Sequence, residues 1–238
     1  MKYKRIQPIV KQQNRDLVKV EFKWDGEPPM PGQFFMLTLE RLDIFLPRPF
    51  SVFDFQNGVL SFLIKPIGRF TNLIMNTDDF HIMGPLGNPA PFATSGIFVG
   101  GGIGVAPLHF HAKQTENFIF IAGSLTDDLR FFISDLEKRG RVIYTTEDGS
   151  YGVKGLATEP LEEILKEKRE ITVFACGPVP MLEKVKEITG GRNTYLYMEQ
   201  VMGCGTGGCK GCAIKTTDGY KMVCSDGPVF NAVEVIFE

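Results

Sequence analysis

Residues 97–110, IFVGGGIGVAPLHF, join a short apolar strand to a helical segment through a run of glycines. Glycine lets a backbone come close to a pyrophosphate, and the free amides at the start of a helix attract an anion. A glycine run alone can also be no more than a tight turn between a strand and a helix. The strand before it and the helix expected at 105–115 favour a dinucleotide-binding loop.

The chain between residues 94 and 192 repeats this alternation. Further buried strands are expected at 117–122, 141–145 and 171–175. Further helices are expected at 127–139, 161–168 and 179–188. Short loops between alternating strands and helices predict a central Rossmann-like parallel α/β sheet with helices on its faces.

The second strand of a dinucleotide-binding domain is usually followed by an acidic residue, which residues 123–126, GSLT, do not supply. Asp127 and Asp128 come directly afterwards. Two carboxylates would repel a 2′-phosphate, so NAD(H) is expected rather than NADP(H).

The first 90 residues instead contain short β-type runs that Gly, Pro, Asn and Asp separate. These runs lie at 15–24, 33–40, 50–55, 59–66 and 80–84. Many short strands with turn signals and little helical period predict an N-terminal antiparallel β-barrel.

The segment LPRPFS, residues 46–51, holds Arg48 between two prolines. A guanidinium on a pre-set backbone can bind a diphosphate through two hydrogen bonds, and the Ser51 hydroxyl could reach a ring nitrogen. Taken alone, such an arginine is more often an ordinary surface residue at the start of a strand. Residues 67–73 look like a turn that leads into a short helix, which is a second possible phosphate site.

The segment MGCGTGGCKGC, residues 202–212, places three cysteines among five glycines. With Cys224 the spacing is C-x4-C-x2-C-x11-C, and its first part is the plant-type spacing of a [2Fe-2S] cluster. Glycine permits the tight left-handed turns that converging thiolates require, and bare amides can point at the sulfurs. A structural zinc site is the alternative, although zinc sites usually pair two close Cys-x-x-Cys units.

Composition narrows the function classes. A net charge of −2 over 238 residues leaves no broad basic face for nucleic acid. Residues 96–110 form the best apolar run, which is too short to span a membrane, and the charged start does not resemble a signal peptide. These features indicate the cytoplasm. An odd, clustered set of five cysteines argues against a disulfide framework, and the isolated Cys176 is typical of a buried free thiol.

Three elements in this order carry a resemblance to the ferredoxin reductase superfamily: RPFS, then GGGIGVAP with ACGPVPML, then the four-cysteine loop. The chain is most similar to the electron-transfer subunits of dihydroorotate dehydrogenase B, through MGCGTGGCKGC, MVCSDGPVF and EDGSYGVKG. The resemblance covers essentially the whole chain. It implies an FAD-binding barrel at 1–93, an NAD-binding α/β domain at 94–192 and a small [2Fe-2S] domain at 193–238.

The resemblance also implies which residues bind the cofactors, because each matching motif places a family binding residue at a position of this sequence. The FAD diphosphate and flavin edge are assigned to Arg48, Pro49, Phe50 and Ser51. The ribityl and adenosine side is assigned to Leu63, Ile64 and Lys65, and the phosphates to Gly68, Phe70 and Thr71. NAD is assigned to Gly101, Gly102, Ile103 and Gly104, with Cys176 and Gly177 near the nicotinamide. Iron is assigned to Cys204, Cys209, Cys212 and Cys224.

Two positions depart from the superfamily's usual pattern. Phe50 stands where tyrosine is common, which removes a hydroxyl contact. Phe70 precedes Thr71 where glycine is usual, so its side chain is expected to point away from the diphosphate.

The implied function is electron transfer in a complex. Nicotinamide moves electron pairs and an iron–sulfur cluster moves single electrons, so a flavin is expected between them, with no acid–base catalyst. The external partner would be the FMN-containing subunit that oxidises dihydroorotate, in a heterotetramer, because that barrel needs about 250 residues of its own. Alternatives are a subunit of a NADH-dependent ferredoxin:NADP oxidoreductase or hydrogenase and, more remotely, a zinc-stabilised binding module.

Overall fold

The computed structural model describes residues 3–39, 44, 46–168, 170–190 and 193–237. The chain divides into two compact units. The first unit contains Met1–Ala90, Glu199–Ile214 and Tyr220–Pro228, and the second contains Pro91–Met198, Lys215–Gly219 and Val229–Glu238. The C-terminal part of the chain therefore contributes to both units.

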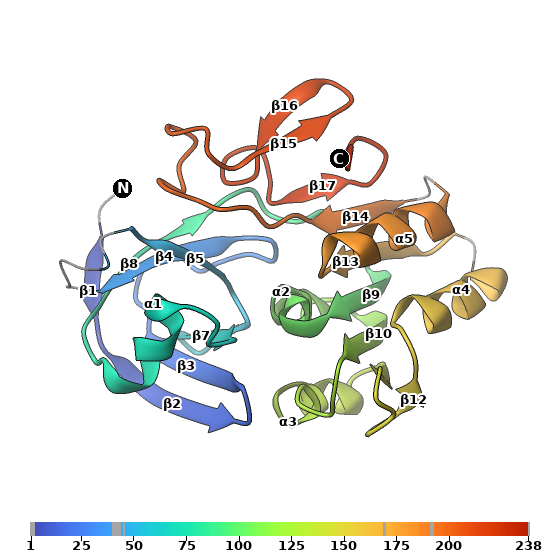
Figure 1. The fold of residues 1–238 in the computed structure, drawn as a ribbon, viewed down its shortest axis with the longest axis horizontal. Helices are drawn as coiled ribbons and strands as arrows, with labels where there is room; N and C mark the ends of the chain where they lie inside the picture. Colours follow the sequence, from blue (N-terminus) through green and yellow to red (C-terminus); the bar gives the residue numbers. More distant parts are fainter. Residues whose placement is uncertain (1–2, 40–43, 45, 169, 191–192, 238) are drawn as a thin grey trace. The chain divides into compact units, whose positions relative to one another are not determined.

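The first unit contains two four-stranded antiparallel sheets (Figure 1). One sheet has the strand order β1 (Lys4–Ile6), β8 (Phe80–Leu86), β4 (Phe34–Leu39) and β5 (Arg48–Ser51). The other has the order β2 (Pro8–Asn14), β3 (Leu17–Lys23), β7 (Val59–Ile64) and β6 (Asp54–Gln56). Between β7 and β8 lie the short helices α1 (Arg69–Leu73) and η1 (Ile74–Asn76). The antiparallel β structure that the sequence predicts is confirmed, and its closure into a barrel stays a prediction.

Aromatic side chains join the two sheets of the first unit. Phe22 of β3 meets Phe80 of β8 with ring centroids 5.4 Å apart, and Phe35 of β4 meets Phe62 of β7 at 5.8 Å. All four rings are fully buried, and both pairs have the edge-to-face geometry that aromatic rings prefer. These contacts hold the two sheets face to face.

The predicted strand at 15–24 is wrong at its start. Arg15 adopts a left-handed conformation (φ 48°), which makes a turn between β2 and β3. The sequence pattern also misses β2 itself, because Ile9 and Val10 on this edge strand are exposed and do not alternate with polar residues.

The second unit is built on a seven-stranded sheet (Figure 1). Its strand order is β12 (Val153–Lys154), β11 (Arg141–Thr146), β10 (Asn117–Ser124), β9 (Ser95–Gly101), β13 (Thr172–Cys176), β14 (Thr194–Tyr197) and β17 (Val229–Asn231). All neighbours pair in parallel except β14 and β17. This confirms the predicted parallel α/β sheet. The strand order reverses between β9 and β13, which is the topological switch point where such sheets bind ligands.

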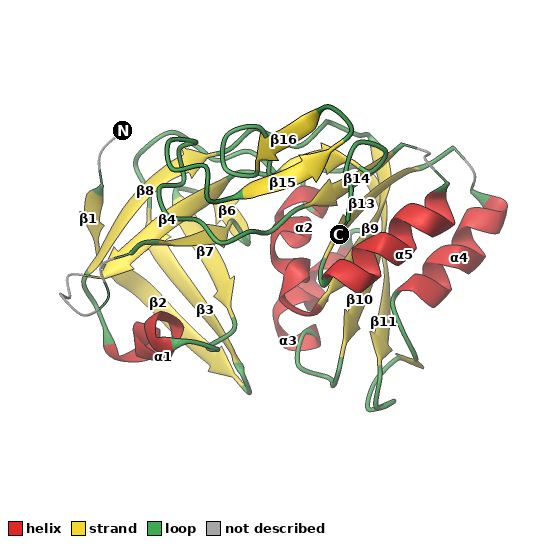
Figure 2. Ribbon diagram, turned by 45° about the horizontal axis from the view of Figure 1, so that its top comes forward, coloured by secondary structure: helices red, strands yellow, loops and turns green. Residues whose placement is uncertain are grey.

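Helices cover both faces of this sheet (Figure 2). One face carries α2 (Val105–Ala112), which follows η2 (Gly102–Gly104), and α3 (Arg130–Ile133), which continues into η3 (Ser134–Lys138). The other face carries α4 (Thr158–Glu167) and α5 (Val179–Thr189). The single helix predicted at 127–139 is thus two shorter pieces, and α2 ends earlier than predicted. A two-stranded hairpin of β15 (Ala213–Thr216) and β16 (Gly219–Met222) lies between β14 and β17 in the chain. Within the described ranges, no helix is both long and apolar enough to cross a bilayer.

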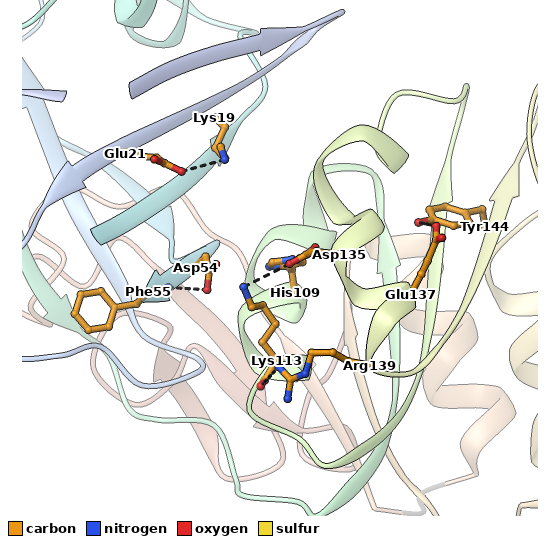
Figure 3. Close-up of polar contacts among 10 residues, drawn as sticks. All are labelled: Lys19, Glu21, Asp54, Phe55, His109, Lys113, Asp135, Glu137, Arg139 and Tyr144. Atoms are coloured by element: carbon orange, nitrogen blue, oxygen red, sulfur yellow. Dashed lines mark hydrogen bonds and ion pairs between the residues drawn. The ribbon is translucent and has the colours of Figure 1, made fainter. Parts of the chain in front are cut away.

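Polar contacts fasten α2 to η3 in the second unit (Figure 3). His109 Nε2 lies 2.8 Å from Asp135 Oδ1, and Lys113 Nζ lies 3.4 Å from Asp135 Oδ2. Burial alone would raise the pKa of Asp135, but hydrogen bonds and charge from His109 and Lys113 lower it to about 2. Arg139 donates a hydrogen bond to the carbonyl of Lys113. The helix that follows the glycine loop is therefore held by an ionised carboxylate.

The buried His111 on α2 predicts acid sensitivity. Its Nδ1 lies 2.7 Å from the Tyr197 hydroxyl, and its ring packs on Phe174 with centroids 4.4 Å apart. Burial lowers the pKa of His111 to about 4. Since the unfolded chain binds this proton near pH 6.5, the stabilisation is complete above pH 6.5 and is lost as the pH falls toward 4. We expect this residue to remove about 2 kcal/mol of unfolding free energy between pH 7.5 and pH 5.

Denaturant unfolding of the wild type and of the double variant His111→Phe/Tyr197→Phe at these two pH values checks this expectation. The double variant replaces both polar partners, so neither is left buried without a hydrogen bond. Its loss of stability on acidification should be smaller by about 2 kcal/mol. Equal losses in the two proteins would show that His111 does not carry the effect.

Candidate functional site

The structure places the four cysteines of the cysteine loop, residues 204–224, in the first unit and brings two of their sulfurs close together. Cys212 Sγ lies 3.1 Å from Cys224 Sγ, and both residues are buried. Cys204 is half-buried and Cys209 is exposed, and the backbone amide of Cys209 donates to Cys204 Sγ at 3.4 Å. None of the five cysteines, all of which the structure describes, forms a disulfide bond. The loop therefore offers four thiols from one short region.

Backbone amides point at three of these sulfurs, and the sulfur of Cys212 accepts a hydrogen bond from the amide of Cys224 at 3.4 Å. Cys204 Sγ accepts hydrogen bonds from the amides of Cys209 and Thr206, and Cys224 Sγ accepts one from Gly207 at 3.1 Å. The two amides lower the pKa of Cys204 to about 6, whereas burial raises the pKa of Cys224 to about 12. Thiolates are the metal-binding form of cysteine. Hydrogen bonds from backbone amides stabilise the thiolate and so favour metal binding by the loop.

Two glycines of this loop are required by the backbone. Gly205 and Gly207 have φ values of 72° and 83°, in the left-handed region that favours glycine. A methyl group on Gly205 would also lie 2.6 Å from Met36 Cγ on β4. The loop thus rests directly on a strand of the first unit.

Asn88 fastens the segment that carries Cys224. Its side-chain amide donates to the carbonyls of Ser225 and Asp226, both at 3.1 Å, and its backbone amide donates to Gly227 O at 2.6 Å. In the sequence Asn88 is only one residue of a turn-rich segment, PLGNPAP, so no local signal could have identified this role.

An open groove of about 1040 Å³ lies beside the cysteine loop and reaches Pro47, whereas Arg48 lines a different cavity. Cys204 and Cys224 line one part of it, and Pro47 and Leu86 line another. Because Pro47 precedes Arg48 in the chain, a group bound along β5 and a group held by the cysteines would adjoin the same groove.

A second cavity, of about 390 Å³, gathers the predicted FAD residues of two separate segments. Its volume is in the range of small-molecule pockets. The predicted residues that line it are Arg48, Pro49, Phe50, Gly68, Phe70 and Thr71, together with Ile44, Leu46, Ile67 and Arg69. Ser51, Leu63, Ile64 and Lys65 are not among its lining residues.

The positions of these remaining residues follow from the strands. Ser51 ends β5 and pairs with Phe34. The side chains of Leu63 and Ile64 at the end of β7 are buried, whereas Lys65 is exposed. Only the backbone of Leu63 and Ile64 is thus left to meet a ligand.

The two departures from the usual motif lie together in the cavity wall. The rings of Phe50 and Phe70 have centroids 5.8 Å apart at an interplanar angle of 32°. Phe70 is almost fully buried at 3% exposure, so its ring forms part of the packed interior. The bulky residue is accommodated because Phe50 provides an aromatic partner for it.

Polar groups at the mouth of this cavity are satisfied within the chain. The Arg48 guanidinium is exposed and donates to the carbonyls of Leu46 at 3.0 Å and Pro47 at 3.3 Å. Thr71 Oγ1 accepts hydrogen bonds from the amides of Ile67 and Gly68, both at 3.0 Å, which starts α1. An exposed arginine can exchange such backbone partners for a phosphate at small cost.

The glycine loop of the second unit lies at the switch point of the sheet. A methyl group on Gly104 would lie 2.3 Å from the carbonyl oxygen of Cys176. Gly102 has a φ of 55°, and Ile103 is half-buried. Cys176 is buried at 1% exposure, so its backbone, and not its sulfur, faces the loop.

Met181 is a residue of this region that sequence reasoning missed. Methyl groups placed on Gly101 and Gly177 would lie 2.7 Å from its Sδ and 2.6 Å from its Cε, respectively. A methionine three residues into a helix has the spacing of an ordinary core residue, so the sequence gives no hint of this contact.

The two aspartates that favour NAD(H) lie beside an aromatic contact. The backbone amide of Asp127 donates to Ser150 Oγ at 3.0 Å. The guanidinium of Arg130 stacks over the ring of Tyr151 at 4.3 Å. The preference for NAD(H) over NADP(H) stays a prediction.

Comparison with known proteins gives consistent matches. Residues 199–236 match the family described as the iron–sulfur cluster binding domain of dihydroorotate dehydrogenase B. The chain is 38% identical to the electron transfer subunit of dihydroorotate dehydrogenase B (NAD(+)) from Caldanaerobacter subterraneus subsp. tengcongensis, over 93% of each chain. It is 36% identical to the subunit of the same name from Geobacillus thermodenitrificans, over 87% of this chain and 86% of that protein.

Solved structures are similar in fold. A structure of the NADH-dependent reduced ferredoxin-NADP oxidoreductase matches with a TM-score of 0.86 and 25% identity, covering 97% of this chain and 89% of that chain. The ferredoxin reductase of carbazole 1,9a-dioxygenase matches with a TM-score of 0.72 and 21% identity, covering 82% and 68% of the two chains.

Proposed function

The chain belongs to the family of dihydroorotate dehydrogenase B electron-transfer subunits, and we propose that it passes electrons between NAD(H), FAD and a [2Fe-2S] cluster. The final exchange is with the FMN of a partner subunit that oxidises dihydroorotate, in a cytoplasmic heterotetramer that serves pyrimidine biosynthesis. In this proposal, residues 1–93 bind FAD, residues 94–192 bind NAD(H) and residues 193–238 bind the cluster.

The cysteine loop fits a two-iron cluster. Such a cluster takes four thiolates, two on each iron. The loop supplies Cys212 and Cys224 with their sulfurs close together, and it supplies Cys204 and Cys209, of which Cys209 donates its backbone amide to the sulfur of Cys204. Among the described residues, no three His, Cys, Asp or Glu side chains meet around a single ion. The support for the cluster that the family description names is therefore the donor set of four thiols, and not their arrangement.

Two regions of the structure suit the nucleotide cofactors. Arg48 and the Phe50 and Phe70 rings would hold parts of FAD, since they combine an exposed cation with an apolar wall. The bare backbones of Gly101 and Gly177 at the switch point would receive NAD(H). When bound, a flavin converts the electron pairs of nicotinamide into the single electrons that iron–sulfur clusters carry.

One observation carries the proposal above the others. The cysteine loop is part of the same compact unit as β5, and a single groove is lined by Pro47, Cys204 and Cys224. A flavin at Arg48 would then bind next in the chain to Pro47, a residue that shares this groove with the cysteines, as short-range electron transfer requires.

A second candidate comes from the solved structure with a TM-score of 0.86, an NADH-dependent ferredoxin-NADP oxidoreductase. In that case the chain would bind the same cofactors but would exchange electrons with a different partner. Affinity purification of the chain from its own cells, with identification of the protein that accompanies it, separates the two candidates.

The proposal is tested on anaerobically purified protein. We expect a visible spectrum with both flavin and iron–sulfur absorption, and about one FAD and two irons per chain. NADH should bleach both contributions in the absence of oxygen. A colourless protein that contains zinc would overturn the proposal.

A further inference from the structure

Sheets of this kind bind ligands in a crevice at the switch point, and the floor of this region is bare backbone. Gly101 ends β9 and Gly177 follows β13, and a methyl group on Gly177 would lie 3.1 Å from the Cα of Gly101. Neither glycine has a side chain to keep a ligand away from the main chain. A nucleotide that enters the switch point must approach this floor.

Met181 fills the space directly above the floor. The position that a methyl group on Gly101 would take lies 2.7 Å from Met181 Sδ, and the equivalent position on Gly177 lies 2.6 Å from Met181 Cε. One thioether thus contacts both glycine backbones at once. A ligand atom and this thioether cannot occupy the same space.

Met181 is the part of the crevice wall that can move. It lies in the first turn of α5 and is only half-buried. Pro178, the other side chain near Gly101, has its Cδ 3.0 Å from the same methyl position and is held by its ring. Methionine is unbranched and has three rotatable side-chain bonds, so it adopts a different rotamer readily.

We propose that Met181 closes the crevice in the free protein and that a nicotinamide nucleotide must displace its thioether to reach Gly101 and Gly177. This inference rests on the proposed NAD(H)-binding function, and it adds Met181 as a residue that limits entry of the nucleotide to the switch point. A ligand that binds only the open form has an apparent affinity reduced by the fraction of molecules that are open. Met181 therefore sets how tightly the nucleotide binds without belonging to the glycine motif.

Calorimetric titration of the oxidised holoprotein with NAD⁺ tests the proposal. The variant Met181→Ala should bind NAD⁺ more tightly than the wild type by about three- to tenfold, because the crevice is then always open. Met30→Ala is the matched control, since Met30 is an exposed methionine of the first unit and its loss should leave the dissociation constant unchanged. Thermal melts of all three proteins show that each is folded.

The outcomes separate the two proposals. If the wild type binds NAD⁺ and Met181→Ala binds it equally or more weakly, the displacement proposal is overturned and the proposed function stands. If Met30→Ala gains as much affinity as Met181→Ala, the effect does not come from the crevice. If the wild type does not bind NAD⁺, both the proposed function and this inference fail.

Discussion

Replacement of Cys224 by serine should remove the iron from the chain and leave the flavin in place. Cys224 Sγ is buried and lies 3.1 Å from Cys212 Sγ, so it supplies half of the closest donor pair. A serine hydroxyl is not ionised at neutral pH and is a much weaker ligand than a thiolate. We expect the iron content to fall from about two atoms per chain to near zero.

Retention of FAD should accompany this loss, because the residues around the 390 Å³ cavity are unchanged. Iron analysis and the visible spectrum of the anaerobically prepared variant give both quantities in one preparation. Ser225→Ala is the matched control, since Ser225 is the exposed neighbour of Cys224 and Asn88 contacts only its carbonyl. A Cys224→Ser protein with its full complement of iron would mean that the fourth ligand lies elsewhere.

The sequence predicted the second unit well because its signals are local. Strands such as β10 and β13 are continuous apolar runs, and helices separate them at short intervals. The glycine loop identified the strand that begins the nucleotide fold. Helix α2 was harder to delimit, because all eight of its residues are buried and no polar face marks its end.

The site was predicted as a set of motifs, and its assembly depends on contacts between distant segments. The cysteine loop follows the α/β region in the chain, yet it belongs to the first unit through Gly205 on Met36 and through Asn88 on Ser225. No local pattern encodes such contacts, because each involves residues more than a hundred positions apart. Met181 was missed for a similar reason, because its role depends on contact between helix α5 and Gly101 at the end of β9.

The structure explains how the two residues that depart from the usual flavin motif are accommodated. The sequence marked Phe50 and Phe70 as unusual residues for a flavin site. The structure pairs their rings, so the two unusual residues pack against each other. A motif comparison considers each position separately and cannot show that the two side chains are in contact in the folded protein.

The second large effect is expected at Gly104, where alanine should destabilise the second unit and weaken NAD⁺ binding more than tenfold. The backbone of Gly104 is helical, with a φ of −59°, so conformation alone would permit any residue. A methyl group there would lie 2.3 Å from the carbonyl oxygen of Cys176 and 2.9 Å from the amide nitrogen of Gly177. Main-chain atoms cannot rotate away, so α2 and the end of β13 must separate. We expect a loss of about 3 kcal/mol in unfolding free energy.

Gly102→Ala is the control, because it lies in the same loop and has no other atom within 4 Å of the added methyl group. Its only cost is the left-handed conformation, with a φ of 55°, which amounts to about 1 kcal/mol. Urea unfolding compares the stability of the two variants, and calorimetry with NAD⁺ compares Gly104→Ala with the wild type. If Gly104→Ala were no less stable than Gly102→Ala, the close approach of α2 to β13 would not be what holds the crevice together. The difference between the variants therefore isolates steric exclusion from backbone conformation within a single loop.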